Sequence, residues 1–269
     1  MNDAPEPLAR RLEFARGIAQ RAGGLTLQYF QRDGLQIDRK SDDSPVTIAD
    51  REAEKLLRAE IAAAYPDDAI LGEEFGEQQG ASGYRWILDP IDGTKSFIHG
   101  APLYTTLVGV EHEGRSQVGV IYAPATEEMV FAATGGGAWV TRAGSEPAPA
   151  RVSTVATLAE SLFLTTEIAS FSKNRPRDAL DVYLELQRAA RLARTWGDAY
   201  GYLMVATGRA EVMIDPEMNL WDAAPLQPIL TEAGGSFTDW QGQPSIHSGE
   251  GVATNGRVLA EVLAITREG

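Results

Sequence analysis

Three short apolar segments between residues 104 and 134 constrain the fold of this chain more than any other feature. They read YTTLVGVEH, SQVGVIYA and EMVFAAT, and the turn-forming stretches EGR and PATE separate them. Short β-type segments joined by such turns are typical of antiparallel strands that follow one another in a sheet. We therefore expect an antiparallel meander in this part of the chain.

Helix and strand signals precede the meander. Apolar side chains recur at steps of three and four within residues 5–30, and again from Ile48 to Tyr65, where Pro66 follows. This spacing predicts two amphipathic helices. The segments AIL (69–71) and YRWIL (84–88) predict buried strands. The first part of the chain is therefore expected to be an α+β lobe.

The second half of the chain alternates between strand and helix signals. Strands are expected near 161–166, 211–214, 236–240 and 251–254, and helices near 177–191, 198–207, 221–235 and 256–266. Such alternation predicts a layered α/β lobe. The segment 141–151, TRAGSEPAPAR, is small, polar and proline-containing. We take it as the boundary between an N-terminal lobe (1–140) and a C-terminal lobe (151–269).

Composition limits the classes of partner and chemistry. The chain has 24 basic and 38 acidic side chains, a net charge of −14, no Cys and only three His. Nucleic acids and anionic membranes are bound mainly through Lys and Arg, so neither is expected as a partner. The absence of Cys excludes a disulfide framework and a thiolate nucleophile. Neither a signal-type apolar core at the N-terminus nor an 18-residue apolar run is present, so a cytoplasmic protein is expected.

The stretch DPIDGTKSF carries the strongest chemical signal. Asp89 lies at the C-terminal end of a predicted strand, Pro90 interrupts that strand, and Asp92 follows three residues later. Two close carboxylates repel each other unless a cation is present or one is protonated. All-oxygen ligation suits Mg²⁺, and a helix opening at Gly93 and Thr94 would offer N–H groups to an anion. The alternative is an Asx-turn that closes the strand.

Two further acidic elements occur where predicted elements begin or end. Glu73 and Glu74, in LGEEFG, follow the strand signal AIL, and Asp222, in NLWDAAP, stands at the start of a predicted helix. A solvated loop would account for the two glutamates, and an ordinary N-cap would account for Asp222. Taken with DPIDGT, the three elements suggest one metal-bridged phosphate site.

The elements GEE, WILDPIDGTKSF and WDAAPLQPILTEAGG, in this order and at these separations, resemble the inositol monophosphatase-like family of Mg²⁺-dependent, Li⁺-sensitive phosphatases. The resemblance covers nearly the whole chain. It implies a layered αβαβα sandwich, a homodimer, two or three Mg²⁺ ions and a small-molecule phosphate monoester as substrate. One departure is Pro225, which stands where the family usually has a small residue. Because proline costs little in the first turn of a helix, we do not expect it to disturb the site.

The resemblance also implies roles for individual residues. The metal ligands would be Glu73, Asp89, Asp92, Asp222 and the carbonyl of Ile91, and the phosphate-binding turn would be Gly93 and Thr94. Glu73 and the Thr94 hydroxyl would orient the attacking water, and Asp50 would help to take up its proton. Two metal ions can hold the attacking and the leaving oxygen of an in-line displacement, so no covalent phosphoenzyme is required.

The stretches DPIDGTKSFIHG and WGDAYGYLMVATGRAEVMID look most similar to the histidinol-phosphatase branch of that family. Histidinol phosphate carries an amine, and charge-assisted hydrogen bonds are about twice as strong as neutral ones. Asp198, which follows Gly197, and Asp215 are therefore expected to contact the substrate, and Lys95 is a further candidate. Asp198 could instead cap the helix that follows it, and Lys95 could be a plain surface charge.

Other readings remain open at this point. The same chemistry on inositol 1-phosphate or another polyol phosphate is the first alternative. Nucleotide 3′-phosphates and fructose bisphosphate fit less well, because no basic cluster that could bind a second phosphate stands near the motifs. The nearest basic pair, Arg175 and Arg177, is expected to begin a helix on a solvated face. A catalytically dead binding module is a different class, as is a dinucleotide binder suggested by TGGGAW (134–139), which lacks the G-x-G-x-x-G spacing.

Overall fold

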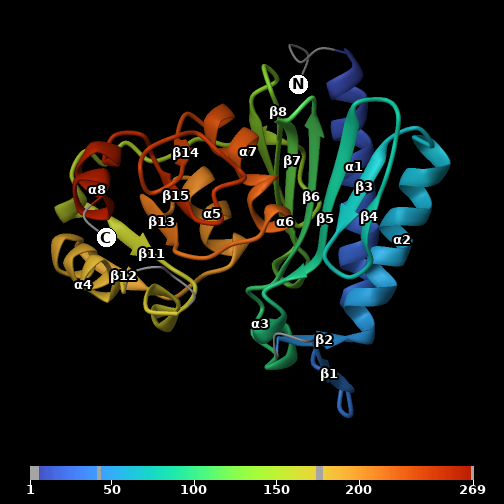
Figure 1. The fold of residues 1–269 in the computed structure, drawn as a ribbon, viewed down its shortest axis with the longest axis horizontal. Helices are drawn as coiled ribbons and strands as arrows, with labels where there is room; N and C mark the ends of the chain where they lie inside the picture. The colour runs from blue at the N-terminus through green and yellow to red at the C-terminus, as the bar shows by residue number, and fades with distance from the viewer. Residues whose placement is uncertain (1–5, 41–43, 174–177, 268–269) are drawn as a thin grey trace.

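The computed structural model describes residues 6–40, 44–173 and 178–267. Two sheets and the described helices form five layers in the order helix, sheet, helix, sheet, helix (Figure 1). The predicted αβαβα sandwich is confirmed.

An eight-stranded sheet forms the second layer. Its strand order is β10-β9-β8-β7-β6-β5-β3-β4, and only β3 and β5 run parallel to each other. The strands are β3 (Ala69–Gly72), β4 (Gly76–Gln78), β5 (Tyr84–Asp92), β6 (Thr105–His112), β7 (Arg115–Ala123), β8 (Glu128–Ala133), β9 (Ala138–Arg142) and β10 (Ala148–Pro149). The predicted meander is therefore confirmed as β6, β7 and β8, and it continues into β9.

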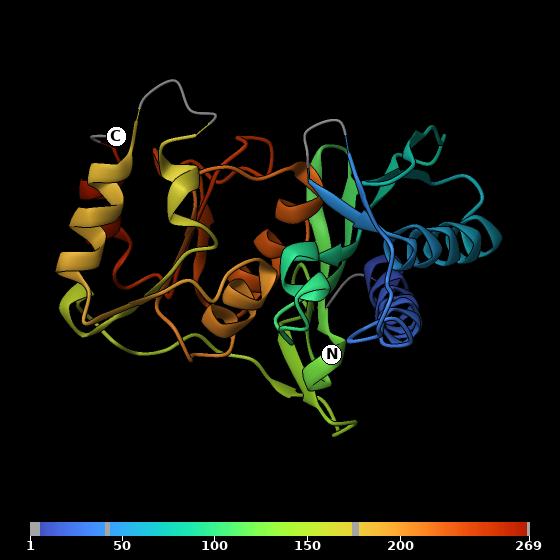
Figure 2. The same cartoon turned by 90° about the horizontal axis from the view of Figure 1, so that it is seen from below.

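Helices α1 (Glu6–Thr26) and α2 (Ile48–Ala64) cover the outer face of this sheet (Figures 1 and 2). Their apolar stripes are buried against Trp86 and Phe131 of the sheet. A two-stranded ribbon of β1 (Ile37–Arg39) and β2 (Pro45–Thr47) leads into α2. Thr47 caps α2 and forms a capping box with Asp50, so the first turn of α2 has a fixed place beside the sheet.

A five-stranded sheet forms the fourth layer, in the order β12-β11-β13-β15-β14. Its strands are β11 (Leu162–Leu164), β12 (Leu192–Arg194), β13 (Val212–Asp215), β14 (Ser236–Thr238) and β15 (Gly251–Thr254). β11 is parallel to β12 and to β13, whereas β15 is antiparallel to both of its neighbours. Helices α4 (Leu180–Ala189) and α8 (Leu259–Thr266) cover its outer face (Figure 2).

The middle layer consists of α5 (Ala199–Ala206), α6 (Leu220–Ala223) and α7 (Leu226–Glu232). One continuous apolar core joins these helices to both sheets; it includes Ile87, Leu107, Ile121, Leu203, Met213, Ile229, Leu230, Phe237 and Ala253. A Cβ on Gly119 of β7 would lie 2.0 Å from the Pro225 carbonyl oxygen, so only glycine permits this approach of the helical layer. The remaining helical elements are the short α3 (Thr94–Ile98) and three 3₁₀ turns at Pro124–Thr126, Leu158–Glu160 and Ile168–Phe171.

Two expectations about local structure are wrong. The single helix predicted from Trp221 is two helices, α6 and α7, because the chain breaks at Ala224 and Pro225. Pro225 has no N–H to donate to the Trp221 carbonyl, and Pro228 has none for the Ala224 carbonyl. The Ala224 carbonyl instead accepts a hydrogen bond from the Ser116 hydroxyl. Strand β5 also continues past Pro90 to Asp92, with a register shift between Asp89 and Asp92.

The first sheet extends to Pro149, and the second sheet begins at Leu162. Helices α5, α6 and α7 of the second half share a core with both sheets, so the core alone does not separate two lobes. The division into lobes 1–140 and 151–269 stays a prediction. Among the described helices, none has the length and apolar character needed to cross a membrane.

Candidate active site

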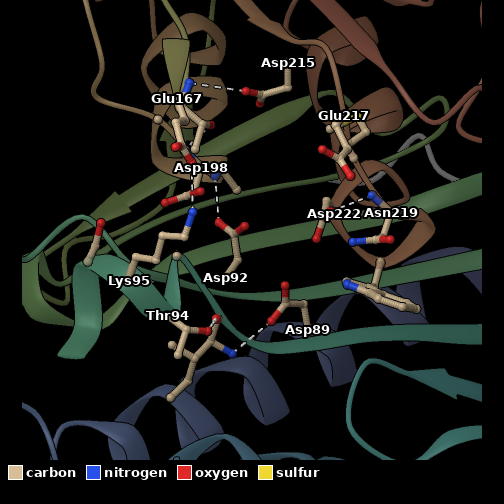
Figure 3. A pocket seen from close by; sticks show the side chains of 18 of the residues that line it. Asp89, Asp92, Thr94, Lys95, Glu167, Asp198, Asp215, Glu217, Asn219 and Asp222 are labelled. Atoms are coloured by element: carbon tan, nitrogen blue, oxygen red, sulfur yellow. Dashed lines mark hydrogen bonds and ion pairs between the residues drawn. The ribbon is translucent and has the colours of Figure 1, made fainter. Parts of the chain in front are cut away.

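A cavity of about 520 Å³ opens between the two sheets (Figure 3). Its lining contains every predicted site residue except Asp50. These residues are Glu73, Asp89, Ile91, Asp92, Gly93, Thr94, Lys95, Gly197, Asp198, Asp215 and Asp222. Asp50 is 1% exposed and lies behind the lining, where it contacts Thr94.

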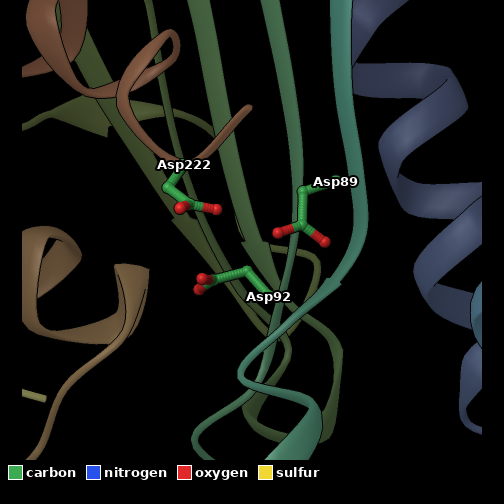
Figure 4. A group of neighbouring side chains, drawn as sticks. All are labelled: Asp89, Asp92 and Asp222. Carbon is green, nitrogen blue, oxygen red and sulfur yellow. The ribbon is translucent and has the colours of Figure 1, made fainter. Parts of the chain in front are cut away.

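Three carboxylates form the centre of the cavity. Each of Asp89, Asp92 and Asp222 offers one oxygen, and these oxygens lie within 4.8 Å of one another (Figure 4). Asp89 and Asp92 come from the end of β5, and Asp222 comes from α6. In a regular strand, residues three apart face opposite sides. The irregularity between Asp89 and Asp92 brings both side chains to the same side.

Local hydrogen bonds orient each of the three carboxylates. Asp89 Oδ1 accepts from the Ile91 N–H at 3.0 Å. Asp92 Oδ2 accepts from the Thr105 hydroxyl at 2.9 Å and from the Ala199 N–H at 2.7 Å. Asp222 Oδ2 accepts from the Asn219 N–H at 2.6 Å, within the capping box of α6.

The electrostatics of this cluster fit a bound cation. Burial, followed by the charges of neighbouring carboxylates, holds the pKa values of Asp89 and Asp222 well above the ordinary value of 3.8. Burial also raises the pKa of Asp92 to about 7, although the Ala199 N–H and the Thr105 hydroxyl act against it. Three desolvated acids that repel one another, with carboxylate oxygens as the only donors, are a ligand set suited to a hard ion such as Mg²⁺.

Glu73 and Glu74 follow β3, which runs parallel to β5, so both strands end at the same edge of the sheet. Lys40 Nζ donates to Glu73 Oε1 at 2.8 Å and to Glu74 Oε1 at 2.6 Å. Burial opposes the charge of Lys40, but the two carboxylates outweigh it and raise its pKa. Burial raises the pKa of Glu73 despite this ion pair.

The turn after β5 contains the hydroxyl predicted for water and phosphate. Gly93 has φ +83° and precedes α3, which begins at Thr94. Thr94 Oγ1 donates to the Ile91 carbonyl at 3.0 Å and lies 3.4 Å from Asp50 Oδ1. Burial raises the pKa of Asp50 to about 6, against the hydrogen bonds from Thr47. A carboxylate with this pKa can accept a proton near neutral pH.

The wall opposite the turn is also acidic. Asp198 lies between Glu167 and Asp92 in Figure 3. Its backbone has φ +47° and ψ −160°, a strained conformation for a residue other than glycine. Its side chain does not cap α5, so that alternative is wrong. Among the described residues its carboxylate accepts no hydrogen bond, and desolvation and three neighbouring aspartates hold its pKa well above the usual range.

The other predicted substrate contacts have partners within the protein. Asp215 is 6% exposed, and both of its oxygens accept hydrogen bonds, from the Thr166 N–H at 3.2 Å and the Tyr202 hydroxyl at 2.9 Å. Lys95 lies at the exposed rim, where its ammonium is 2.8 Å from Glu167 Oε2. Gly197 packs so closely on Thr166 that no side chain would fit there.

Sequence reasoning missed Lys40, Thr166, Glu167 and Tyr202, which lie beside the predicted residues. Lys40, Thr166 and Glu167 come from distant parts of the chain and stand in no recognisable motif. Tyr202 lies within the stretch WGDAYGYLMVATGRAEVMID, but nothing in that stretch signals its own role. The capping-box spacing from Thr47 to Asp50 is a local signal that could have fixed the place of Asp50 in α2.

The N–H groups of the TGGGAW turn bind a side chain of the protein itself. The N–H groups of Gly135 and Gly137 each donate at 2.8 Å to the carboxylate of Glu232 on α7. This finding favours a turn between strands over a dinucleotide site. The basic pair Arg175 and Arg177 lies outside the described residues.

Comparison with known proteins gives consistent results. Residues 8–269 match the sequence model of the inositol monophosphatase family. A histidinol-phosphatase of Chlorobaculum parvum is 45% identical over 94% of both chains, and one of Streptomyces coelicolor is 37% identical over 94% of this chain and 95% of its own. The solved structure of an IMPase from Thermotoga maritima superposes with a TM-score of 0.84 at 29% identity, covering 96% of this chain and 97% of the other.

Proposed function

The chain belongs to the inositol monophosphatase family, and we propose that it is a Mg²⁺-dependent phosphomonoesterase that hydrolyses L-histidinol phosphate to L-histidinol and phosphate. The observation that carries the substrate assignment is the carboxylate of Asp198. This carboxylate is desolvated and has no hydrogen-bond partner among the described residues, and the backbone of Asp198 is strained. Asp198 lines the same cavity as the acidic cluster. The similarity to proteins named histidinol-phosphatase supports the same assignment.

We assign the metal ligands to Glu73, Asp89, Asp92, Asp222 and the Ile91 carbonyl, for two or three Mg²⁺ ions. When bound, Mg²⁺ supplies Lewis-acid activation of water and neutralises charge on the phosphate and leaving oxygens. The buried carboxylates contribute a fixed arrangement of oxygens, because backbone N–H groups already hold three of them in place. A preorganised site of this kind needs little rearrangement during the reaction.

Water activation is assigned to the residues around Thr94. The Thr94 hydroxyl and Glu73 orient the attacking water, and Asp50 takes up a proton through Thr94 Oγ1, which lies 3.4 Å from Asp50 Oδ1. The pKa of Asp50, raised by burial to about 6, suits this role at neutral pH. The N–H groups of Gly93 and Thr94 would bind the phosphate.

The alcohol part of the substrate would lie toward Asp198. An ammonium group gains a charge-assisted hydrogen bond there and removes the repulsion between Asp198 and its acidic neighbours. A neutral polyol gains only neutral hydrogen bonds and leaves this repulsion in place. Lys95 at the rim, Gly197 next to Asp198, and Asp215 on the same wall complete the proposed substrate contacts.

The test is phosphate release with Mg²⁺ from L-histidinol phosphate and from inositol 1-phosphate, each with an EDTA control. We expect a strong preference for histidinol phosphate and no turnover with EDTA. A preference for the inositol ester would retain the phosphatase and overturn the substrate. Turnover of neither ester, nor of a wider panel, would favour the dead binding module, against which the full set of expected side chains argues.

Three further expectations belong to this proposal. The protein would act as a homodimer, would be cytoplasmic, and would consist of lobes 1–140 and 151–269. Light scattering on the purified protein tests the first, fractionation of cells the second, and limited proteolysis within 141–151 the third.

A further inference from the structure

A buried hydrogen-bond network lies directly behind Asp198. Thr166 follows β11 and Asp215 ends β13. Because β11 and β13 are parallel neighbours, their carboxyl ends lie at the same edge of the sheet. The two residues meet there, with the Thr166 N–H donating to Asp215 Oδ1 at 3.2 Å.

The network continues from the strand ends to the first turn of α5. The Tyr202 hydroxyl donates to Asp215 Oδ2 at 2.9 Å, and Tyr202 is 1% exposed. Thr166 Oγ1 in turn accepts from the Asp198 N–H at 2.9 Å. Asp215 therefore links the end of β11, through Thr166, to α5, through Tyr202, and Asp198 lies directly before α5.

The backbone at Asp198 requires such support. A non-glycine residue with φ +47° and ψ −160° is held in a sparsely populated conformation. Strain of this kind persists only where surrounding contacts over-determine it. The Thr166 hydroxyl supplies one contact, the adjacent Ala199 N–H is fixed by Asp92, and Gly197 packs against the Thr166 backbone.

Asp215 has a structural role at this wall. Each of its oxygens accepts a hydrogen bond from a buried or half-buried donor, and loss of the carboxylate would leave these donors without a partner. A buried donor left without its partner is costly. Asp198, by contrast, accepts no hydrogen bond from the described residues, so its carboxylate needs support through its backbone.

We propose that Thr166, Asp215 and Tyr202 are positioning residues that hold Asp198 in its positive-φ conformation, and that they thereby set the preference for a cationic substrate. The substrate part of this inference rests on the proposed function. The three residues act through Asp198 and touch neither the phosphate nor the attacking water.

The central test is the variant Thr166→Val, which keeps the side-chain shape and removes the hydroxyl acceptor. Its KM for L-histidinol phosphate is expected to rise about tenfold, the equivalent of one hydrogen bond to a charged or strained group. Its kcat, and both constants for an amine-free ester such as inositol 1-phosphate, should stay within about twofold of the wild type, since no reacting group is altered. Thr166→Ser keeps the hydroxyl and is expected to restore the wild-type KM.

A double-mutant cycle separates positioning from a general structural effect. If Thr166 acts through Asp198, Thr166→Val adds nothing to the KM of Asp198→Asn, because the interaction that it supports is already lost. Losses that add, or that are equal for both esters, would overturn the proposal. Tyr202→Phe should give the same selectivity change as Thr166→Val, and a uniform loss on both esters would count against it.

A crystal structure of Thr166→Val tests the positioning without any substrate. In the wild type Asp198 Oδ2 lies beside Gly93. We expect φ of residue 198 to leave the positive region and its carboxylate to turn away from Gly93, while the Ala199 N–H keeps its hydrogen bond to Asp92. An unchanged conformation at residue 198 would overturn the inference whatever the kinetics show. Failure of the wild type to hydrolyse either ester would instead refute the proposed function, and the crystal structure would then decide the positioning alone.

Discussion

Asp89 and Asp92 point into the same cavity although they lie three positions apart on one strand. The register shift around Pro90 is what allows this, because a regular strand would send the two side chains to opposite faces. Asp222 completes the group from α6, a helix of the middle layer. The cluster thus depends on a local irregularity and on a long-range contact together.

Asp92→Asn should abolish most of the Mg²⁺-dependent activity. The amide keeps a hydrogen-bond acceptor for Ala199 and Thr105 but removes one negative charge from the cluster. Even outer partners of metal ligands change activity by about 10- to 100-fold, so we expect a loss of at least about 100-fold. Phosphate release and calorimetric Mg²⁺ titration measure the two effects.

The matched control is Asp33→Asn, which makes the same change in charge at an exposed turn after α1. It should leave both activity and Mg²⁺ affinity unchanged. Near-normal activity in Asp92→Asn would refute the metal-site assignment.

The stability of the metal-free protein should fall as the pH rises. Burial raises the pKa values of Asp50, Asp92 and Asp215 from the ordinary 3.8 to about 6, 7 and 6. Between about pH 4 and 7 the folded protein therefore binds more protons than the unfolded chain, and the free energy of unfolding decreases with pH.

Urea unfolding at several pH values, with EDTA and with Mg²⁺, measures this decrease. Mg²⁺ should flatten the dependence above pH 6, because a bound cation stabilises the ionised carboxylates. A metal-free protein that becomes more stable between pH 4 and 7 would contradict the raised pKa values.

Asp198→Asn should be selective for the substrate with an amine. The amide retains the size of the side chain and loses the charge, so the KM for L-histidinol phosphate should rise about tenfold or more. Hydrolysis of inositol 1-phosphate should change little or improve, since one source of repulsion in the cavity is gone. Steady-state kinetics on both esters measures the difference, and equal losses would remove Asp198 as the amine partner.

Two glycine substitutions should change stability in opposite directions. A Cβ at residue 119 would meet the backbone of Pro225, so Gly119→Ala should destabilise the protein by about 1–3 kcal/mol or more. At Gly24, in α1, no atom lies within 4 Å of the place that a Cβ would take. Gly24→Ala should therefore stabilise the protein by about 0.5–1 kcal/mol. Thermal and urea unfolding of both variants provide the comparison, and a stable Gly119→Ala would refute the close contact.

Much of the fold follows from local patterns in the sequence. The meander has strand-length apolar segments and turn residues between them, and α1 and α2 have a clear helical period. The acidic residues of the cavity stand near the ends of elements, where side chains from different elements commonly meet: Glu73 directly follows β3, Asp92 ends β5, and Asp222 lies in the first turn of α6.

The details that were missed depend on contacts between distant segments. The break between α6 and α7 is stabilised by Ser116, which lies on another element, and β5 passes Pro90 because β6 pairs with it on both sides of the irregularity. Thr166 stands in no motif, and Tyr202 carries no signal of its own within WGDAYGYLMVATGRAEVMID. The parallel pairing of β11 with β13 is what brings Thr166 to Asp215. Such relationships are set by tertiary packing, which a local pattern does not record.

The order of synthesis determines when the acidic cluster can form. The ribosome delivers Asp89 and Asp92 long before Asp222, since the α6 helix that carries Asp222 belongs to the last part of the chain. A nascent chain therefore holds two of the three carboxylates without the third until α6 has docked between the sheets. Completion of the acidic cluster therefore requires the middle layer of helices to pack against the first sheet.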